Sequence, residues 1–163
     1  MTVTDVRKDP TALTMTVTSE WDAPIARVWR LWADPRKLER WWGPPTYPAT
    51  VVEHDLRPGG KVSYFMTSPE GEQYHGWWKV IAVDEPLRLD LEDGFADTDG
   101  NPNEAMPTTL STVTFAELAA GGTRMLIETR FPSPEAMNQM IEMGMEEGLA
   151  AAMGQIGAIL ASG

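Results

Sequence analysis

Residues 13–42 read LTMTVTSEWDAPIARVWRLWADPRKLERWW, and the spacing of apolar side chains changes partway along this stretch. Leu13, Met15 and Val17 alternate with threonines, which is the period of a half-buried strand. Further on, apolar residues recur at helical spacing as far as Trp32. The stretch therefore predicts a β-strand followed directly by helix, which is how an α+β fold begins.

Two short helices are expected after this strand. Asp34-Pro35 divides them, because the aspartate can accept from the free amides of a new helix and proline suits the first helical position. Gly43-Pro44-Pro45 ends the second helix. Trp41 and Trp42 are adjacent on it and diverge by about 100°. We expect one to be buried and the other to reach a pocket mouth or a partner, unless both simply anchor the helix on the sheet.

The middle of the chain is divided by turn-forming clusters such as Pro58-Gly59-Gly60 and Gly121-Gly122. The short runs between such turns read as strands: Thr50–Asp55, Lys61–Thr67, Tyr74–Val83, Leu87–Glu92, Thr109–Glu117 and Thr123–Phe131. Strands joined by short turns predict an antiparallel meander. The polar segment Gly94–Pro107 is either a mobile lid or simply a flexible loop.

The longest predicted element is one helix from Ser133 to about Leu160, capped by the serine and opened by Pro134. Four glycines interrupt its apolar stripe, each less favourable than alanine by about 1 kcal/mol, so another interaction must offset them: Gly144, Gly148, Gly154 and Gly157. At the other end, residues 1–10 are expected to form a flexible N-terminus. Residues 11–163 then form a single domain.

Several local strings resemble one branch of the START-like (SRPBCC) superfamily. They are Glu39-Arg40-Trp41-Trp42-Gly43-Pro44, Asp55-Leu56-Arg57-Pro58-Gly59-Gly60, Tyr74-His75-Gly76 with Trp78, and Val113-Thr114-Phe115 with Gly121-Gly122-Thr123-Arg124. The branch is named for homology to the C-terminal domain of the activator of the heat-shock ninety-kilodalton chaperone ATPase. The resemblance implies a helix-grip fold, in which a curved antiparallel sheet of about seven strands wraps around a long C-terminal helix.

The same resemblance implies a small-molecule binding protein, with an apolar pocket between the sheet and the C-terminal helix. Two alternatives stay open because a fold does not determine function. One is an enzyme of the polyketide cyclase or dehydratase kind. The other is a co-chaperone-like interaction module, although no chaperone-docking N-terminal domain is evident in this sequence.

Alternation along the strands and spacing on the final helix nominate the pocket lining. Aromatic and thioether side chains would suit an apolar or aromatic ligand, and methionines adapt their shape to it. The alternative is that these residues fill a solid core. The candidate ligand-binding residues are Trp42, Tyr64, Met66, Tyr74, Trp78, Phe115, Met137, Met140, Ile141, Gly144 and Gly148.

His75 and Glu92 are the candidate polar residues of this pocket. In the enzyme alternative, Tyr64, Tyr74, His75 or Glu92 would transfer protons. His75 is preferred to the other histidine, His54. Because side chains alternate along a strand, His54 points away from the face that carries Asp55. No cofactor or metal is expected, because the chain has two histidines without ligand spacing and no cysteine.

The charge balance restricts the partners. Lys and Arg number 13 against 24 for Asp and Glu, and the net charge of −11 is unfavourable for nucleic acid and anionic membranes. No apolar run approaches membrane-spanning length, and the N-terminus does not read as a signal peptide, so we expect a cytoplasmic protein. The expected partner is a small apolar or aromatic molecule, with a homodimer or a chaperone as open alternatives.

Overall fold

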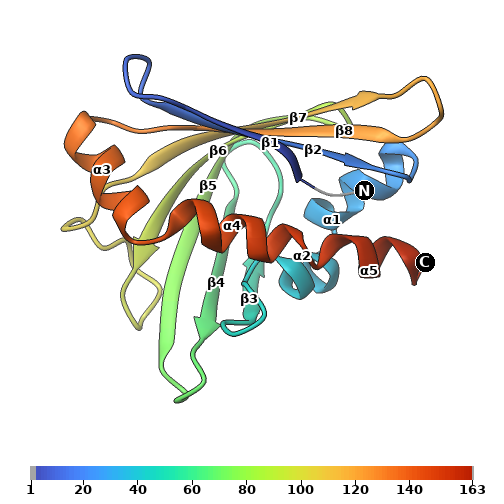
Figure 1. Ribbon diagram of the computed structural model, residues 1–163. Coiled ribbons are helices and arrows are strands. Elements are labelled where there is room, and N and C mark those ends of the chain that lie inside the picture. The colour runs from blue at the N-terminus through green and yellow to red at the C-terminus, as the bar shows by residue number, and fades with distance from the viewer. Residues whose placement is uncertain (1–2, 163) are drawn as a thin grey trace.

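The computed structural model describes residues 3–162, which form one antiparallel sheet and five helices (Figure 1). The strands are β1 (Val3–Asp9), β2 (Thr14–Trp21), β3 (Ala49–His54), β4 (Lys61–Thr67), β5 (Gln73–Asp84), β6 (Arg88–Ala96), β7 (Thr109–Glu117) and β8 (Thr123–Arg130). The helices are α1 (Ile25–Ala33), α2 (Pro35–Trp41), α3 (Pro134–Glu142), α4 (Met145–Met153) and α5 (Ile156–Ala161). The predicted α+β helix-grip class is confirmed.

The sheet has the strand order β1-β2-β8-β7-β6-β5-β4-β3, so consecutive strands pair everywhere except where β2 joins β8. Its curvature gives it a concave inner face, across which α3, α4 and α5 run (Figure 1). The alternation read in β2 is correct, since Met15, Val17 and Trp21 are buried on this inner face. The chain therefore builds one open sheet in which an early strand pairs with a late one, and the C-terminal helices cover the inner face of this sheet.

Most of the segment expected to be a flexible N-terminus forms a strand that the sequence analysis did not predict. Val3–Asp9 pairs antiparallel with β2, with Val6 opposite Val17, and makes the sheet eight-stranded instead of about seven-stranded. Residues 1 and 2 of that prediction lie outside the described residues. Because this is an edge strand held mainly by backbone pairing, most of its side chains stay exposed and show no apolar alternation.

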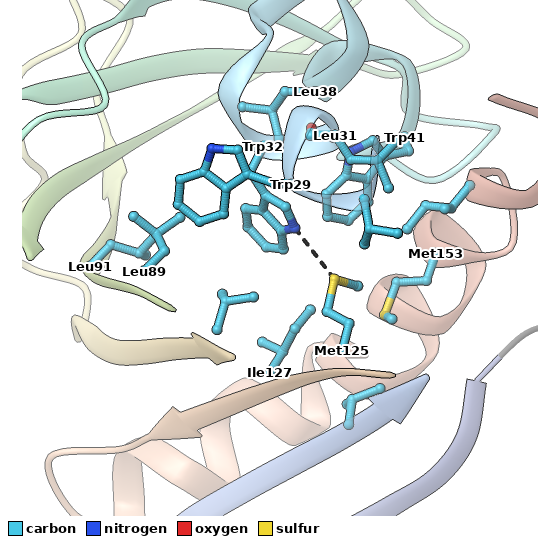
Figure 2. Close-up of a cluster of buried hydrophobic side chains, with 14 of the residues drawn as sticks. Trp29, Leu31, Trp32, Leu38, Trp41, Leu89, Leu91, Met125, Ile127 and Met153 are labelled. Atoms are coloured by element: carbon cyan, nitrogen blue, oxygen red, sulfur yellow. Dashed lines mark hydrogen bonds between the residues drawn. The ribbon is translucent and has the colours of Figure 1, made fainter. Parts of the chain in front are cut away.

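The two short helices form as predicted. The Asp34 side chain accepts from the Arg36 amide at 2.9 Å and caps α2. Trp41 is fully buried, and its indole N–H donates to the Leu31 carbonyl at 2.9 Å. These helices pack a tryptophan-rich cluster against the inner face of the sheet (Figure 2), where the Trp32 indole N–H contacts the Met125 sulfur at 3.4 Å.

The C-terminal segment forms three helices, whereas one continuous helix was predicted. The chain turns at Gly144, whose φ of 88° lies in the left-handed region that glycine tolerates best. This residue ends the run of α3 and begins α4. A second break at Gly154–Gln155 separates α4 from α5. Two of the four glycines, Gly144 and Gly154, therefore mark the points where the segment bends, whereas Gly148 and Gly157 lie inside α4 and α5.

The C-terminal helices are anchored at their α5 end. The Gln155 side-chain amide donates to the Gly43 carbonyl at 2.7 Å and to the Trp41 carbonyl at 3.3 Å, which ties this segment to the end of α2. Arg27 on α1 donates to the Leu160 carbonyl. Within residues 3–162, no helix has the length and apolar character needed to cross a bilayer.

Candidate ligand cavity

A cavity of about 310 Å³ lies between the inner face of the sheet and the α3–α4 segment, and we call it the main cavity. Its walls are largely apolar and come from β4, β6, β7, β8, the end of α2 and the C-terminal helices. The lining residues are Trp42, Pro44, Tyr64, Met66, Asp93, Phe95, Ser111, Ile127, Thr129, Met140, Met143, Gly144, Met145, Gly148 and Leu149.

A smaller space of about 140 Å³, the side lobe, adjoins the main cavity and shares five of its lining residues: Tyr64, Met66, Asp93, Phe95 and Met140. Its other wall includes Tyr74 and Pro107. Pro107 belongs to the segment predicted as a lid or a flexible loop. That segment folds back on itself, and the Asp97 carboxylate accepts from the amides of Asp99 and Asn101 at 2.9 Å each. The loop thus contributes a wall to the side lobe.

Three aromatic rings pack together at the inner end of the main cavity. Trp42 and Trp78 meet edge to face with ring centroids 4.8 Å apart, and Tyr64 lies 6.1 Å from each of them. Trp42 and Tyr64 line the cavity, while Trp78 is fully buried behind them. We call Trp42, Tyr64, Trp78 and their neighbour Asp93 the polar end of the cavity.

Gly76 makes room for the Tyr64 side chain. The two residues are cross-strand partners on β5 and β4, and a Cβ placed at Gly76 would lie 2.4 Å from the Tyr64 hydroxyl oxygen. Real Cβ atoms do not approach that closely, so any larger residue at position 76 would displace the phenol. The phenol ring therefore lies over Gly76, across the inner face of the sheet.

Asp93 faces the same space from β6, where it pairs with Trp78 on β5. Burial raises the pKa of its carboxyl from 3.8 to about 7, and hydrogen bonding with the Tyr64 hydroxyl and the Gly94 amide only partly opposes this. The pKa of the Tyr64 phenol is raised well above its usual value, first by burial and then by the charge of Asp93. Near neutral pH the cavity therefore holds a neutral phenol and a carboxyl group that can gain or lose a proton.

Six of the residues nominated from the sequence line the main cavity: Trp42, Tyr64, Met66, Met140, Gly144 and Gly148. A Cβ placed at Gly148 would meet nothing within 4 Å, so the space beside this glycine is open. Tyr74 lies at the rim of the side lobe, 53% exposed, and its hydroxyl donates to Glu72 at 3.0 Å. Of the adjacent tryptophans, Trp41 is the buried one and Trp42 reaches the cavity, as their divergence predicts.

Four other nominated residues lie outside both linings. Trp78 is fully buried behind Trp42 and Tyr64, and Phe115 packs edge to face against Trp29 with ring centroids 5.5 Å apart. Met137 is buried in the core, and Ile141 is partly buried and packs against the core cluster. For Phe115 and Met137 the alternative of a filled core is the one the structure shows, because the cavity occupies only part of the space between sheet and helices.

The placement predicted for the two polar candidates is corrected by the strand register. His75 contributes to the wall of the side lobe, but its ring is directed to the outer face, 5.3 Å from that of Phe65. Glu92 also lies on the outer face, opposite Lys79. The other histidine, His54, interacts with the Trp32 carbonyl at 2.9 Å and supports α1.

The residue that the sequence reasoning missed is Asp93. The strand predicted for this region ended at Glu92, four residues before the end of β6 at Ala96, although Leu89 and Leu91 already set the inward phase that Asp93 continues. Phe95 follows in the same phase and lines both spaces. Extending the predicted strand by four residues, to Ala96, would have placed Asp93 and Phe95 on the cavity side of the sheet.

A second depression, of about 470 Å³, lies on the outer face of the sheet. It carries ion-paired side chains, including Arg88, which contacts Asp90 at 3.0 Å. In the described part of the chain, no cluster of three or more His, Cys, Asp or Glu side chains is placed to hold a metal ion. The inner cavity is therefore the better candidate for ligand binding, because it combines apolar walls with a few convergent polar groups.

Comparison with known proteins agrees with this architecture. The model of the family described as Activator of Hsp90 ATPase homolog 1-like protein matches residues 22–161. Protein Ms6760 from Mycobacterium smegmatis is 51% identical in sequence, with 97% of this chain and 96% of that chain covered and a TM-score of 0.90. A protein from Arthrobacter aurescens is 46% identical, with 99% and 94% covered and a TM-score of 0.94.

A more distant structure shares the fold alone. CalU16 from Micromonospora echinospora is 20% identical, with 95% of this chain and 82% of that chain covered and a TM-score of 0.59. No curated protein matches the chain.

Proposed function

Since the chain belongs to the family of Activator of Hsp90 ATPase homolog 1-like proteins, as its sequence motifs predicted, we propose that it binds a small, largely apolar molecule in the main cavity. Proteins of this fold family generally bind hydrophobic ligands. The observation that carries the proposal is the cavity of about 310 Å³, which reaches the size of small-molecule sites. Its methionine, phenylalanine and leucine side chains would cover the body of such a ligand.

The experiment that tests this function is native mass spectrometry of the protein purified from its own host. We expect a species heavier than the chain by the mass of one small molecule, which is lost on denaturation and recovered in the organic extract. The matched control is Gly148→Leu, which fills the open space beside α4. If wild type and variant both carry no extra mass and neither takes up apolar dyes, the binding function is wrong.

A second candidate function is proton-transfer catalysis in the same cavity, of the cyclase or dehydratase kind. The observation that favours it is the raised pKa of Asp93, about 7, beside the Tyr64 hydroxyl. The Asp93 carboxylate would remove a proton from the carbon next to a carbonyl group of the ligand. The Tyr64 hydroxyl would donate a hydrogen bond to the oxygen of the enolate that forms.

A carbonyl probe tests this without a known substrate. In heavy water, NMR follows the exchange of the methyl protons of 2-acetylnaphthalene for deuterium. A catalytic site would accelerate the exchange about 100-fold or more over the Asp93→Asn variant. Equal rates for wild type and Asp93→Asn would leave binding as the function of the cavity.

A further inference from the structure

Two buried hydrogen-bond donors at the polar end of the cavity have no partner within the described residues. They are the indole N–H groups of Trp42 and Trp78. An indole N–H can only donate, and a buried donor left unpaired costs free energy. Both indoles lie close enough to the Tyr64 oxygen to favour negative charge on it. The polar end is therefore arranged to donate hydrogen bonds, and a ligand that accepts one would complete it.

The charges around the polar end restrict what that acceptor can be. The titratable residues that contribute to the two linings are Tyr64, Tyr74, His75 and Asp93. Tyr74 is bonded to Glu72 at the rim and His75 points to the outer face, so Tyr64 is the titratable neighbour that acts on Asp93. Among the described residues, no lysine or arginine lines either space. A ligand carboxylate would meet Asp93 without a compensating positive charge.

A ligand ammonium group would fit an ionised Asp93 but not the indoles. It would bring further N–H donors to a place where the donors of Trp42 and Trp78 already lack an acceptor. A neutral oxygen acceptor avoids both conflicts. When Asp93 is protonated, its carboxyl can itself donate to this oxygen, and the Tyr64 hydroxyl that bonds to the carboxylate becomes free to donate to it as well.

We propose that the ligand of the main cavity carries a neutral hydrogen-bond-accepting oxygen, such as a ketone, ester or amide carbonyl, and that the Tyr64 hydroxyl donates to this oxygen. The inference rests on the proposed binding function and names its ligand class. The apolar body of the ligand then lies toward α3 and α4, against Met140, Met145 and Leu149. The body supplies most of the buried apolar surface, and the polar end selects among bodies of equal shape.

Four naphthalene probes of similar size separate the ligand classes by isothermal titration at pH 7. They are 2-acetylnaphthalene with a neutral carbonyl, 2-isopropenylnaphthalene as its hydrocarbon analogue, 2-naphthoate with a carboxylate, and 2-(aminomethyl)naphthalene with an ammonium group. The hydrocarbon reports on the cavity alone, because it cannot accept a hydrogen bond from Tyr64. The ketone differs from it in the acceptor oxygen and little else.

We expect Tyr64→Phe to weaken ketone binding about tenfold, the loss expected for one hydrogen bond, while hydrocarbon affinity is unchanged. Tyr47→Phe is the matched control, since Tyr47 is an exposed tyrosine that lines neither space. That variant should leave both affinities unchanged. The naphthoate and ammonium probes should bind more weakly than the ketone.

The possible failures are distinguishable. If the hydrocarbon and ketone bind wild type but the ratio of their affinities is the same in Tyr64→Phe, the cavity binds ligands and the proposed contact is wrong. If the ammonium probe binds most tightly and loses affinity in Asp93→Asn, the ligand class is wrong. If none of the four probes binds, this inference and the binding function both fall.

Discussion

The protonation of the Asp93 side chain should change near neutral pH. Its carboxyl is pushed toward the neutral form by burial, which raises its pKa from 3.8 to about 7. Because the folded state binds this proton more tightly than the unfolded state, the stability it contributes is present at low pH. That stability is lost as the pH rises from about 4 to about 7, and a constant penalty remains above this window.

Asp93→Asn should remove this penalty and keep a side chain of the same shape. We expect the variant to gain stability relative to wild type as the pH rises from 5 to 8 in parallel urea denaturations. A shift of about three pKa units sets an upper limit of about 4 kcal/mol on the gain. A stability difference that stays constant across this range would show that Asp93 titrates as an ordinary exposed carboxyl.

Gly76 and Gly94 form a matched pair for testing the position of the Tyr64 phenol. A Cβ at Gly76 would meet the Tyr64 hydroxyl at 2.4 Å, whereas a Cβ at Gly94 would meet the Trp77 ring on the outer face at 2.6 Å. Each alanine variant should therefore lose roughly 1–3 kcal/mol of stability from overpacking. Only Gly76→Ala should lower the affinity ratio of ketone to hydrocarbon probe, by about tenfold.

Titration of both folded variants with the two probes checks this expectation. If Gly94→Ala changes the ratio as much as Gly76→Ala does, the effect comes from general loosening of the sheet and not from displacement of Tyr64.

The difference between Glu92 and Asp93 shows how far residue-level prediction reaches. The sequence supplied the alternation that places Tyr64 and Met66 on the cavity wall. The end of β6 was missed because Gly94 and the polar, turn-forming residues from Asp97 onward read as a loop, while the strand continues to Ala96. Because the predicted strand stopped at Glu92, the outward glutamate at its end was chosen, and the inward Asp93 and Phe95 beyond it were missed.

At the scale of elements, the bend at Gly144 allows α3 and α4 to lie at different angles over the cavity. This φ of 88° and the breaks between helices come from tertiary packing, which local helical spacing does not report. The edge strand β1 was missed for a related reason, because its pairing with β2 depends on backbone groups. The strands that face the core were predictable, since burial imposes a pattern on their side chains.

Gly148 and Gly157 allow the cavity wall to be tested at matched positions on α4 and α5. A Cβ at either glycine would meet nothing within 4 Å, but only Gly148 lines the main cavity. Replacing either with leucine removes a helix-interior glycine, so neither fold should be weakened by helix propensity. We expect Gly148→Leu to abolish uptake of an apolar dye, measured by fluorescence, and Gly157→Leu to leave it unchanged.

Circular dichroism would confirm that both leucine variants are folded. Full dye affinity in folded Gly148→Leu would show that α4 does not wall the binding site.

At the scale of the whole molecule, charge limits which partners the surface can accept. The net charge is −11, and basic side chains on the outer face of the sheet, such as Arg88 and Arg124, form ion pairs with carboxylates. We expect no gel shift of duplex DNA at physiological salt up to roughly 10 µM protein, because no cationic footprint is available for phosphates. Salt-sensitive binding below 1 µM would contradict this.

The main cavity is bounded by segments that span most of the chain, from Trp42 at the end of α2 to Leu149 on α4. A bound ligand therefore stabilises the sheet and the C-terminal helices together, because detaching either destroys the site. At a free concentration 100 times Kd, a ligand specific to the folded state adds about 2.7 kcal/mol. For a domain of this size, that corresponds to a rise in Tm of roughly 5–10 °C.

Thermal unfolding with the hydrocarbon probe should show this rise in wild type and in Gly157→Leu. In Gly148→Leu the probe should leave Tm unchanged, because its site is filled. A rise of equal size in Gly148→Leu would place the stabilising probe somewhere other than the main cavity, such as the depression on the outer face. The comparison therefore tests whether the ligand binds in the main cavity, which the sheet and the C-terminal helices form together.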